Sequence, residues 1–247
     1  MVITFEEMIG VYADQVKLTD GQIPVFGEHT KDIVEIFYEW EHRLLKIAGS
    51  PIPSFDEVSE RMHFFVEYLA GLGALAAASC QEGGQVVEYG SNLALSSHAY
   101  TCITGKPVRA EGYVGSEAID TTDLAGKLGI SGLVTTSPQR TNGVTESRDL
   151  ELGDVAIVSS LRGGSLDNCM NVLDSHPEFN LILGIPSSVL KDYLHKPEQG
   201  EQDVQKFISR YFLQNGYNAR VGSPEKVPGF LVFLATPQIH TPDDHLD

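Results

Sequence analysis

The sequence is poor in cysteine and in long apolar runs. Its three cysteines, Cys80, Cys102 and Cys169, are far apart and form no C-x-x-C pair, so they suggest neither a disulfide framework nor a zinc site. Reduced thiols are expected in a cytoplasmic protein. No apolar stretch approaches the roughly 18 residues needed to span a bilayer. The first ten residues carry acids and lack the basic flank of a secretory signal.

Basic residues are scarce as well. Lysine and arginine number 17 against 34 acidic residues, which gives a formal net charge of −17 over 247 residues. A surface this acidic repels nucleic-acid phosphates and anionic membranes, although the same charge also serves solubility. We therefore expect a small-molecule substrate, with neither a nucleic acid nor a membrane as partner.

Two familiar motifs are absent. Because the sequence contains no G-x-G-x-x-G, a dinucleotide pyrophosphate is not favoured, and because it contains no H-E-x-x-H, the histidines indicate no metal site. What the chain does contain is alternation of short apolar runs with amphipathic segments from residue 85 onward. Strands that alternate with helices predict a parallel sheet covered on both faces.

The predicted organisation has three parts. Residues 1–75 are expected to form an N-terminal helical cap or lid, residues 76–238 a Rossmann-like cofactor-binding domain, and residues 239–247 a loose tail. The fold class is α/β, with three layers and a mostly parallel sheet. Five parallel strands are expected, followed by a C-terminal antiparallel β-hairpin, because only a short loop joins the last two strands. The expected strands cover residues 85–90, 106–114, 132–138, 151–161, 179–186, 217–222 and 229–237.

Helices are expected between and before these strands. The cap should contain helices over 5–18 and 29–49, and a third over 56–80 that starts with a capping box of Ser54 and Glu57. The Ala- and Gly-rich end of this third helix suggests close packing against the sheet. The later helices are expected over 91–105, 116–129, 165–176 and 201–216.

A glycine-containing turn follows the first strand of the sheet, at Glu88-Tyr89-Gly90-Ser91-Asn92. Ligands of open α/β sheets lie beyond the carboxyl ends of the strands, next to this position. Gly90 would allow either a close backbone approach or a positive φ, and Ser91 and Asn92 could cap the next helix. A second acid, Glu111, ends the next strand, where an acid is well placed to bind ribose hydroxyls.

The segment VVEYGSNLAL resembles motif I of the class I S-adenosylmethionine-dependent methyltransferases, in the form acid-x-Gly-x-Asn-x-Gly. The resemblance covers about residues 75 to 237, including the acid that ends the second strand and the closing hairpin. It implies S-adenosyl-L-methionine as cofactor and methyl transfer to an oxygen or nitrogen of a small molecule. It implies that the cofactor-binding residues are Glu88, Gly90, Ser91, Asn92, Glu111, Thr136, Ser137, Ser159 and Ser160, with Thr136 and Ser137 bordering the adenine and Ser159 and Ser160 near the transferred methyl group.

Two positions depart from this pattern. Ala94 stands where the motif has its last glycine, which adds a methyl group, and the fourth strand ends in Ser-Ser-Leu-Arg where many members carry an acid. The second departure argues against metal-assisted catalysis. Arg162 and His195 are the predicted catalytic residues, because both should lie near the carboxyl edge of the sheet and histidine is the usual general base near neutral pH.

Other interpretations of the same residues stay open. The Ser- and Gly-rich stretch 158–168 resembles the phosphate loop of sugar isomerase (SIS) domains, which predicts a sugar-phosphate isomerase or binding domain instead. A third alternative is a methyltransferase-like protein with a non-methylating or structural role. The aromatic residues of the cap fit a lid over a small substrate, ordinary core packing, or a contact between two copies in a homodimer.

Overall fold

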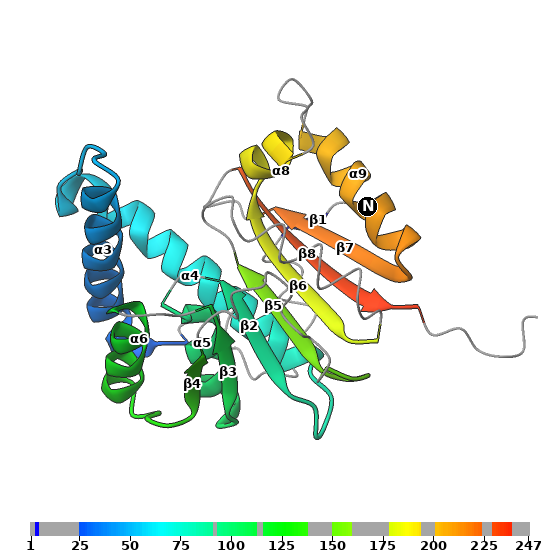
Figure 1. The fold of residues 1–247 in the computed structure, drawn as a ribbon, viewed down its shortest axis with the longest axis horizontal. Helices are drawn as coiled ribbons and strands as arrows, with labels where there is room; N and C mark the ends of the chain where they lie inside the picture. The colour runs from blue at the N-terminus through cyan, green and yellow to red at the C-terminus, as the bar shows by residue number, and fades with distance from the viewer. Residues whose placement is uncertain are drawn as a thin grey trace, which may run out of the picture.

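The computed structural model describes residues 3–4, 25–90, 93–112, 116–137, 150–159, 178–193, 201–223 and 229–238. Within them, one eight-stranded sheet has the order β1-β7-β8-β6-β5-β2-β3-β4 (Figure 1). The strands are Ile3–Thr4 (β1), Val86–Gly90 (β2), Val108–Glu111 (β3), Val134–Ser137 (β4), Val155–Ser159 (β5), Asn180–Pro186 (β6), Tyr217–Ser223 (β7) and Phe230–Pro237 (β8). Strands β2 to β6 are parallel, and β8 pairs antiparallel with β6 and β7. The predicted parallel sheet with a closing hairpin is confirmed.

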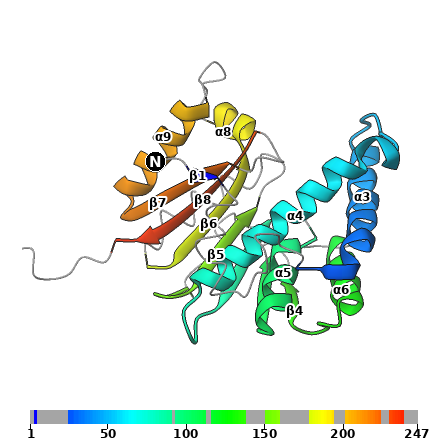
Figure 2. The same ribbon diagram turned by 180° about the vertical axis from the view of Figure 1, so that it is seen from behind.

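Helices cover both faces of this sheet (Figures 1 and 2). They are η1 (Gly27–His29), α3 (Thr30–Ile47), α4 (Phe55–Ser79), α5 (Leu95–Thr104), α6 (Ser116–Lys127), α8 (Ser187–Tyr193) and α9 (Glu201–Gln214). One apolar core joins α3, α4 and α5 to one face, and a second joins α9 to the other face. The molecule therefore has the three layers expected of an α/β protein.

Strand β5 shows why the sheet is buried on both sides. Val155 and Ile157 belong to the core under α4 and α5, whereas Ala156 and Val158 belong to the core under α9. Successive side chains of a strand point to opposite faces, so a strand covered on both faces must be apolar throughout. The continuous run of 155–158 meets this need.

Helix α4 packs against both α5 and the sheet, through two glycines. A Cβ atom at Gly73 would lie 2.8 Å from Ala99 Cβ and would collide with the Ser96 carbonyl oxygen of α5. The second glycine, Gly184, lies in strand β6 of the sheet. A Cβ atom at this position would lie 2.7 Å from Leu72 Cδ1 of α4. The expected close approach to the sheet is present, and the helix glycine itself faces α5.

By length and composition, α4 could cross a membrane, contrary to the expectation that no run is long enough. Its apolar window is 61% buried within the protein. A core helix needs apolar residues on several faces when other layers pack against it, which accounts for its composition.

The N-terminal part differs from the sequence expectation at its start and at its end. Residues 3–4 form a strand that pairs in parallel with β7 at the edge of the sheet, although residues 1 to about 75 were expected to be helical. The predicted capping box is confirmed, since the Ser54 backbone N–H donates to Glu57 Oε2 at 2.8 Å.

The expected boundary between the cap and the Rossmann-like domain, at residue 75, falls inside α4. The expected helices over 5–18 and 165–176 and the tail 239–247 lie outside the described residues, and α8 was not expected.

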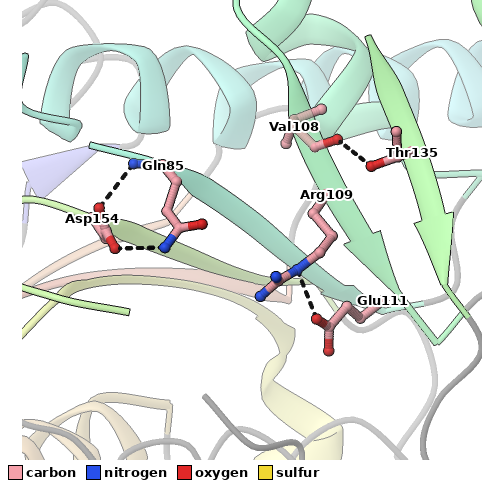
Figure 3. Close-up of polar contacts among 6 residues, drawn as sticks. All are labelled: Gln85, Val108, Arg109, Glu111, Thr135 and Asp154. Atoms are coloured by element: carbon pink, nitrogen blue, oxygen red, sulfur yellow. Dashed lines mark hydrogen bonds and ion pairs between the residues drawn. The ribbon is translucent and has the colours of Figure 1, made fainter. Parts of the chain in front are cut away.

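A polar clamp fixes the amino ends of the two central strands (Figure 3). Asp154 accepts a hydrogen bond from the Gln85 backbone N–H at 2.8 Å and another from Gln85 Nε2 at 3.1 Å. Gln85 directly precedes β2 and Asp154 directly precedes β5. The clamp therefore sets the register of β2 against β5, which decides which residues meet at the carboxyl edge.

Candidate cofactor site at the carboxyl edge of the sheet

The strand ends align at the point where the strand order changes direction. From β2, the chain continues to β3 and β4 on one side and returns to β5 and β6 on the other. Gly90 pairs with Ser159, and Glu111 pairs with Tyr89 and with Ser137. Four of the predicted site residues therefore lie within one residue of the same level of the sheet, at the switch point where such sheets bind ligands.

Glu88 is completely buried, and its carboxyl contacts the first turn of α5. Its Oε2 accepts the Ser97 backbone N–H at 2.8 Å, and its Oε1 accepts the Ser159 hydroxyl at 3.1 Å. Burial raises the pKa of this carboxyl, and the hydrogen bonds from Ser97 and Ser159 oppose the rise. The structure therefore places Glu88 against α5 and β5, where it organises the first turn of α5.

Gly90 is required by a close approach of two strands. A Cβ atom at this position would lie 2.6 Å from the Ser159 carbonyl oxygen and 3.0 Å from its hydroxyl. Gly90 is not among the residues with positive φ, so of the two roles expected for it, the structure selects close backbone approach. Gly112, which follows Glu111, does have a positive φ of 100°.

Glu111 forms an ion pair within its own strand (Figure 3). Arg109 Nε lies 2.8 Å from Glu111 Oε1, and both side chains are partly exposed. Alternate residues of a strand share a face, so a cation two residues before the acid can hold its carboxylate at the edge. Sequence reasoning missed Arg109, although its spacing from Glu111 was visible in VRAE.

Thr136 and Ser137 end β4, beside Glu111. Both are partly buried, and the Ser137 carbonyl oxygen accepts the Gly112 backbone N–H at 3.1 Å. This bond ties the turn after β3 to the end of β4. The remaining predicted residues, Ser91, Asn92, Ser160, Arg162 and His195, lie outside the described residues.

The turn between β2 and α5 has an unusual backbone. Leu93 and Ala94 have φ angles of 54° and 51°, and both are fully buried. The left-handed conformation costs a residue with a side chain about 1–2 kcal/mol. Ala94, at the last position of the motif, thus adopts the conformation for which glycine is best suited.

Sequence reasoning also missed Glu117, in the first turn of α6. Burial raises the pKa of its carboxyl to about 7, and the Leu93 backbone N–H opposes this rise. The signal available in the sequence was an acid six residues after Glu111, at the start of the helix that follows the second strand. Its partner could not be inferred, because the contact depends on how α6 lies against the turn.

Neither the family models nor the curated proteins contain a significant match to this sequence. Similarity is found among solved structures. The O-methyltransferase TomG from Streptomyces achromogenes, involved in tomaymycin synthesis and solved in complex with S-adenosylmethionine, aligns with 92% of this chain and 96% of its own at 15% identity and a TM-score of 0.55. A proposed O-methyltransferase from Klebsiella pneumoniae aligns over the same shares at 15% identity and a TM-score of 0.53.

These alignments run over nearly the whole of each chain. At such low identity the likeness lies in the fold, and it includes the features described above: parallel strands on either side of β2, and a closing antiparallel pair. Residues 160–168, on which the SIS-type alternative mainly depends, lie outside the described residues. The chain has the fold of the class I S-adenosylmethionine-dependent methyltransferases.

Proposed function

We propose that this protein is an enzyme that transfers a methyl group from S-adenosylmethionine to an oxygen or nitrogen atom of a small molecule. The observation that carries the proposal is the alignment of Gly90, Glu111, Ser137 and Ser159 at the switch point of the sheet. The solved structure of TomG, which shares this fold, contains S-adenosylmethionine.

The residues at the edge suit this cofactor chemically. The Glu111 carboxylate can accept hydrogen bonds from ribose hydroxyls, and the hydroxyls of Thr136 and Ser137 lie on the neighbouring strand end. Glu88 and Glu117 lie behind the turn, where burial raises the pKa of both carboxyls. An edge of this kind favours a cationic nucleoside without phosphate, as S-adenosylmethionine is, over a dinucleotide.

When bound, the cofactor supplies an electrophilic methyl group on a sulfonium. The protein has to align the acceptor for in-line displacement and to take up the proton that the acceptor loses. Arg162 and His195 are proposed for these tasks. Among the described histidines, His98 is an unsuitable base for an acceptor because it is completely buried in the protein.

A small acceptor in the cytoplasm fits the remaining observations. The net charge of −17 disfavours a nucleic-acid substrate, and Cys80 and Cys102 are free thiols. Part of the cap rests on the core, since Phe37 and Trp40 of α3 are buried there. We further propose that the cap acts as a lid over the acceptor.

Thermal unfolding with added ligands tests the proposed function. S-adenosylhomocysteine at a hundred times its dissociation constant should stabilise the protein by about 2.7 kcal/mol, whereas sugar phosphates should produce no shift. Glu111→Ala should abolish the nucleoside shift, because no carboxylate remains for the ribose hydroxyls.

The control is Glu82→Ala, which removes an exposed acid next to the amino end of β2. It should leave the nucleoside shift unchanged. Stabilisation by sugar phosphates alone would overturn the proposal. Binding of S-adenosylhomocysteine without methyl transfer to any oxygen or nitrogen acceptor would instead favour the methyltransferase-like protein with a non-methylating role.

A further inference from the structure

The described end of the turn that leads into α5, Leu93 and Ala94, offers the helix no side-chain cap. The N-cap residue is Ala94, whose methyl side chain makes no capping hydrogen bond. Ala94 and Leu93 are also both left-handed without being glycine. Side chains from β2, α5 and α6 lie around this end of the turn and the first turn of α5.

His98 holds the turn from within α5. Its Nδ1 lies 2.7 Å from the Ala94 carbonyl oxygen, and its Nε2 lies 3.1 Å from the Thr121 carbonyl oxygen of α6. Both oxygens only accept, so both contacts are hydrogen bonds together only when both ring nitrogens carry a proton. Burial lowers the pKa of His98, and the two carbonyl contacts oppose this effect. The ring lies between the end of the turn and α6, and it donates one hydrogen bond when neutral and two when protonated.

Glu117 approaches the turn from α6, where the Leu93 backbone N–H favours the charged form of its carboxyl and so opposes the rise in its pKa. Its Oε1 is buried and has no hydrogen-bond partner among the described residues. Asp120 and Glu88 face it with like charge and add to the burial in raising its pKa. Arg43 of α3 pairs with Asp120 and so offsets part of that charge.

Glu88 completes the arrangement from the sheet, through the Ser97 backbone N–H at 2.8 Å. Elements β2, α5 and α6 therefore each contribute one ionisable side chain to this turn or to the first turn of α5. A buried carboxyl that lacks a full set of partners is costly, so Glu117 is poorly explained as a device for stability alone.

We propose that Glu117 and His98 are positioning residues that hold Leu93 and Ala94 in the left-handed turn which a glycine at position 94 would adopt without strain. The inference rests on the proposed function, because a ligand at the switch point would lie against this turn. Displacement of Leu93 or Ala94 would move the backbone that meets the cofactor. Glu117 and His98 would therefore affect cofactor affinity without touching the cofactor.

Calorimetric titration with S-adenosylhomocysteine tests Glu117. Glu117→Leu removes the acceptor for the Leu93 N–H and should weaken binding by about 5- to 30-fold, the range expected for a lost charge-assisted hydrogen bond. Glu117→Gln keeps an acceptor oxygen and should restore most of the affinity. Asp123→Leu, which removes an exposed acid from the same helix, should change the affinity little.

The stability of the same variants distinguishes positioning from a structural role. Glu117→Leu removes a poorly solvated carboxyl, so its melting temperature at pH 8 should equal or exceed that of the wild type while its affinity falls. A parallel loss of stability and affinity would overturn the inference, as would unchanged affinity in Glu117→Leu.

Amide hydrogen exchange gives a readout that needs no ligand. Protection of the Leu93 N–H should fall at least about tenfold in Glu117→Leu and recover in Glu117→Gln. If the wild type fails to bind S-adenosylhomocysteine, the proposed function is wrong, and the exchange result still decides whether Glu117 holds the turn. Equal protection in all three proteins would refute that role.

His98 is tested by a double-mutant cycle with Ala94. His98→Leu should weaken binding more in the wild type than in the Ala94→Gly background, since glycine needs less support in a left-handed turn. His98→Gln serves as the milder change if the leucine variant fails to fold. The same loss of affinity in both backgrounds would show that His98 acts independently of the strained turn.

Discussion

At the scale of single residues, the ion pair between Arg109 and Glu111 makes the ribose contact testable. Arg109→Met should weaken the binding of adenosine about 5- to 10-fold, the effect of losing one charge-assisted contact that orients the carboxylate. It should leave the weaker binding of dideoxyadenosine unchanged, because that ligand lacks both ribose hydroxyls. Competition titrations with the two nucleosides measure the difference.

Two controls accompany this prediction. Arg220→Met removes an exposed arginine of β7 and should alter neither affinity. Arg109→Lys keeps the positive charge and should lie between the wild type and the methionine variant. An equal loss for adenosine and dideoxyadenosine in Arg109→Met would mean that Arg109 supports the strand in general and does not orient Glu111.

At the scale of secondary-structure elements, the contact between α4 and α5 depends on Gly73. Gly73→Ala should destabilise the protein by about 1–3 kcal/mol, because its new Cβ would overlap the backbone of α5 at Ser96. The displacement would shift α5, so cofactor affinity should fall as well. Urea unfolding and titration with S-adenosylhomocysteine measure the two effects.

The matched control lies in an open part of α6. A Cβ at Gly126 would meet nothing closer than Ser131 Oγ at 3.7 Å. Gly126→Ala should therefore be neutral or stabilise the protein by up to about 1 kcal/mol, the difference in helix propensity. A destabilisation of similar size in both variants would show that the Gly73 effect is not one of packing.

At the scale of the whole molecule, stability should depend on pH through Glu117. Its pKa is raised from 4.5 to about 7 in the folded protein, so the folded state binds more protons than the unfolded state between these values. The associated stability is complete below about pH 4.5 and is lost as the pH rises through 7.

Glu117→Gln should remove this dependence. After allowance for solvent screening of a partly exposed group, the variant should gain about 1–2 kcal/mol at pH 8 and little at pH 4.5. Urea unfolding from pH 4.5 to 8 measures the difference between the two proteins. A constant difference at all pH values would contradict the raised pKa of Glu117.

The amino-acid sequence by itself determined the layers and the order of the elements. Alternation of apolar runs with amphipathic segments depends only on neighbours in the chain, as does the capping box at Ser54 and Glu57. The short loop between the last two strands likewise required an antiparallel pair. The sequence also pointed to the turn at Gly90 and to Glu111, because both follow strands directly.

The tertiary structure alone decided what each of these residues does. Glu88 faces inward because α5 presents the Ser97 N–H to it, and Gly90 is needed because β5 passes close by. Glu117 contacts Leu93 only because α6 lies against the turn. Helix α4 likewise needs the tertiary structure to be interpreted, since its composition alone fits a membrane span as well as a core helix. Such contacts join residues far apart in the chain, so no local pattern of side chains encodes them.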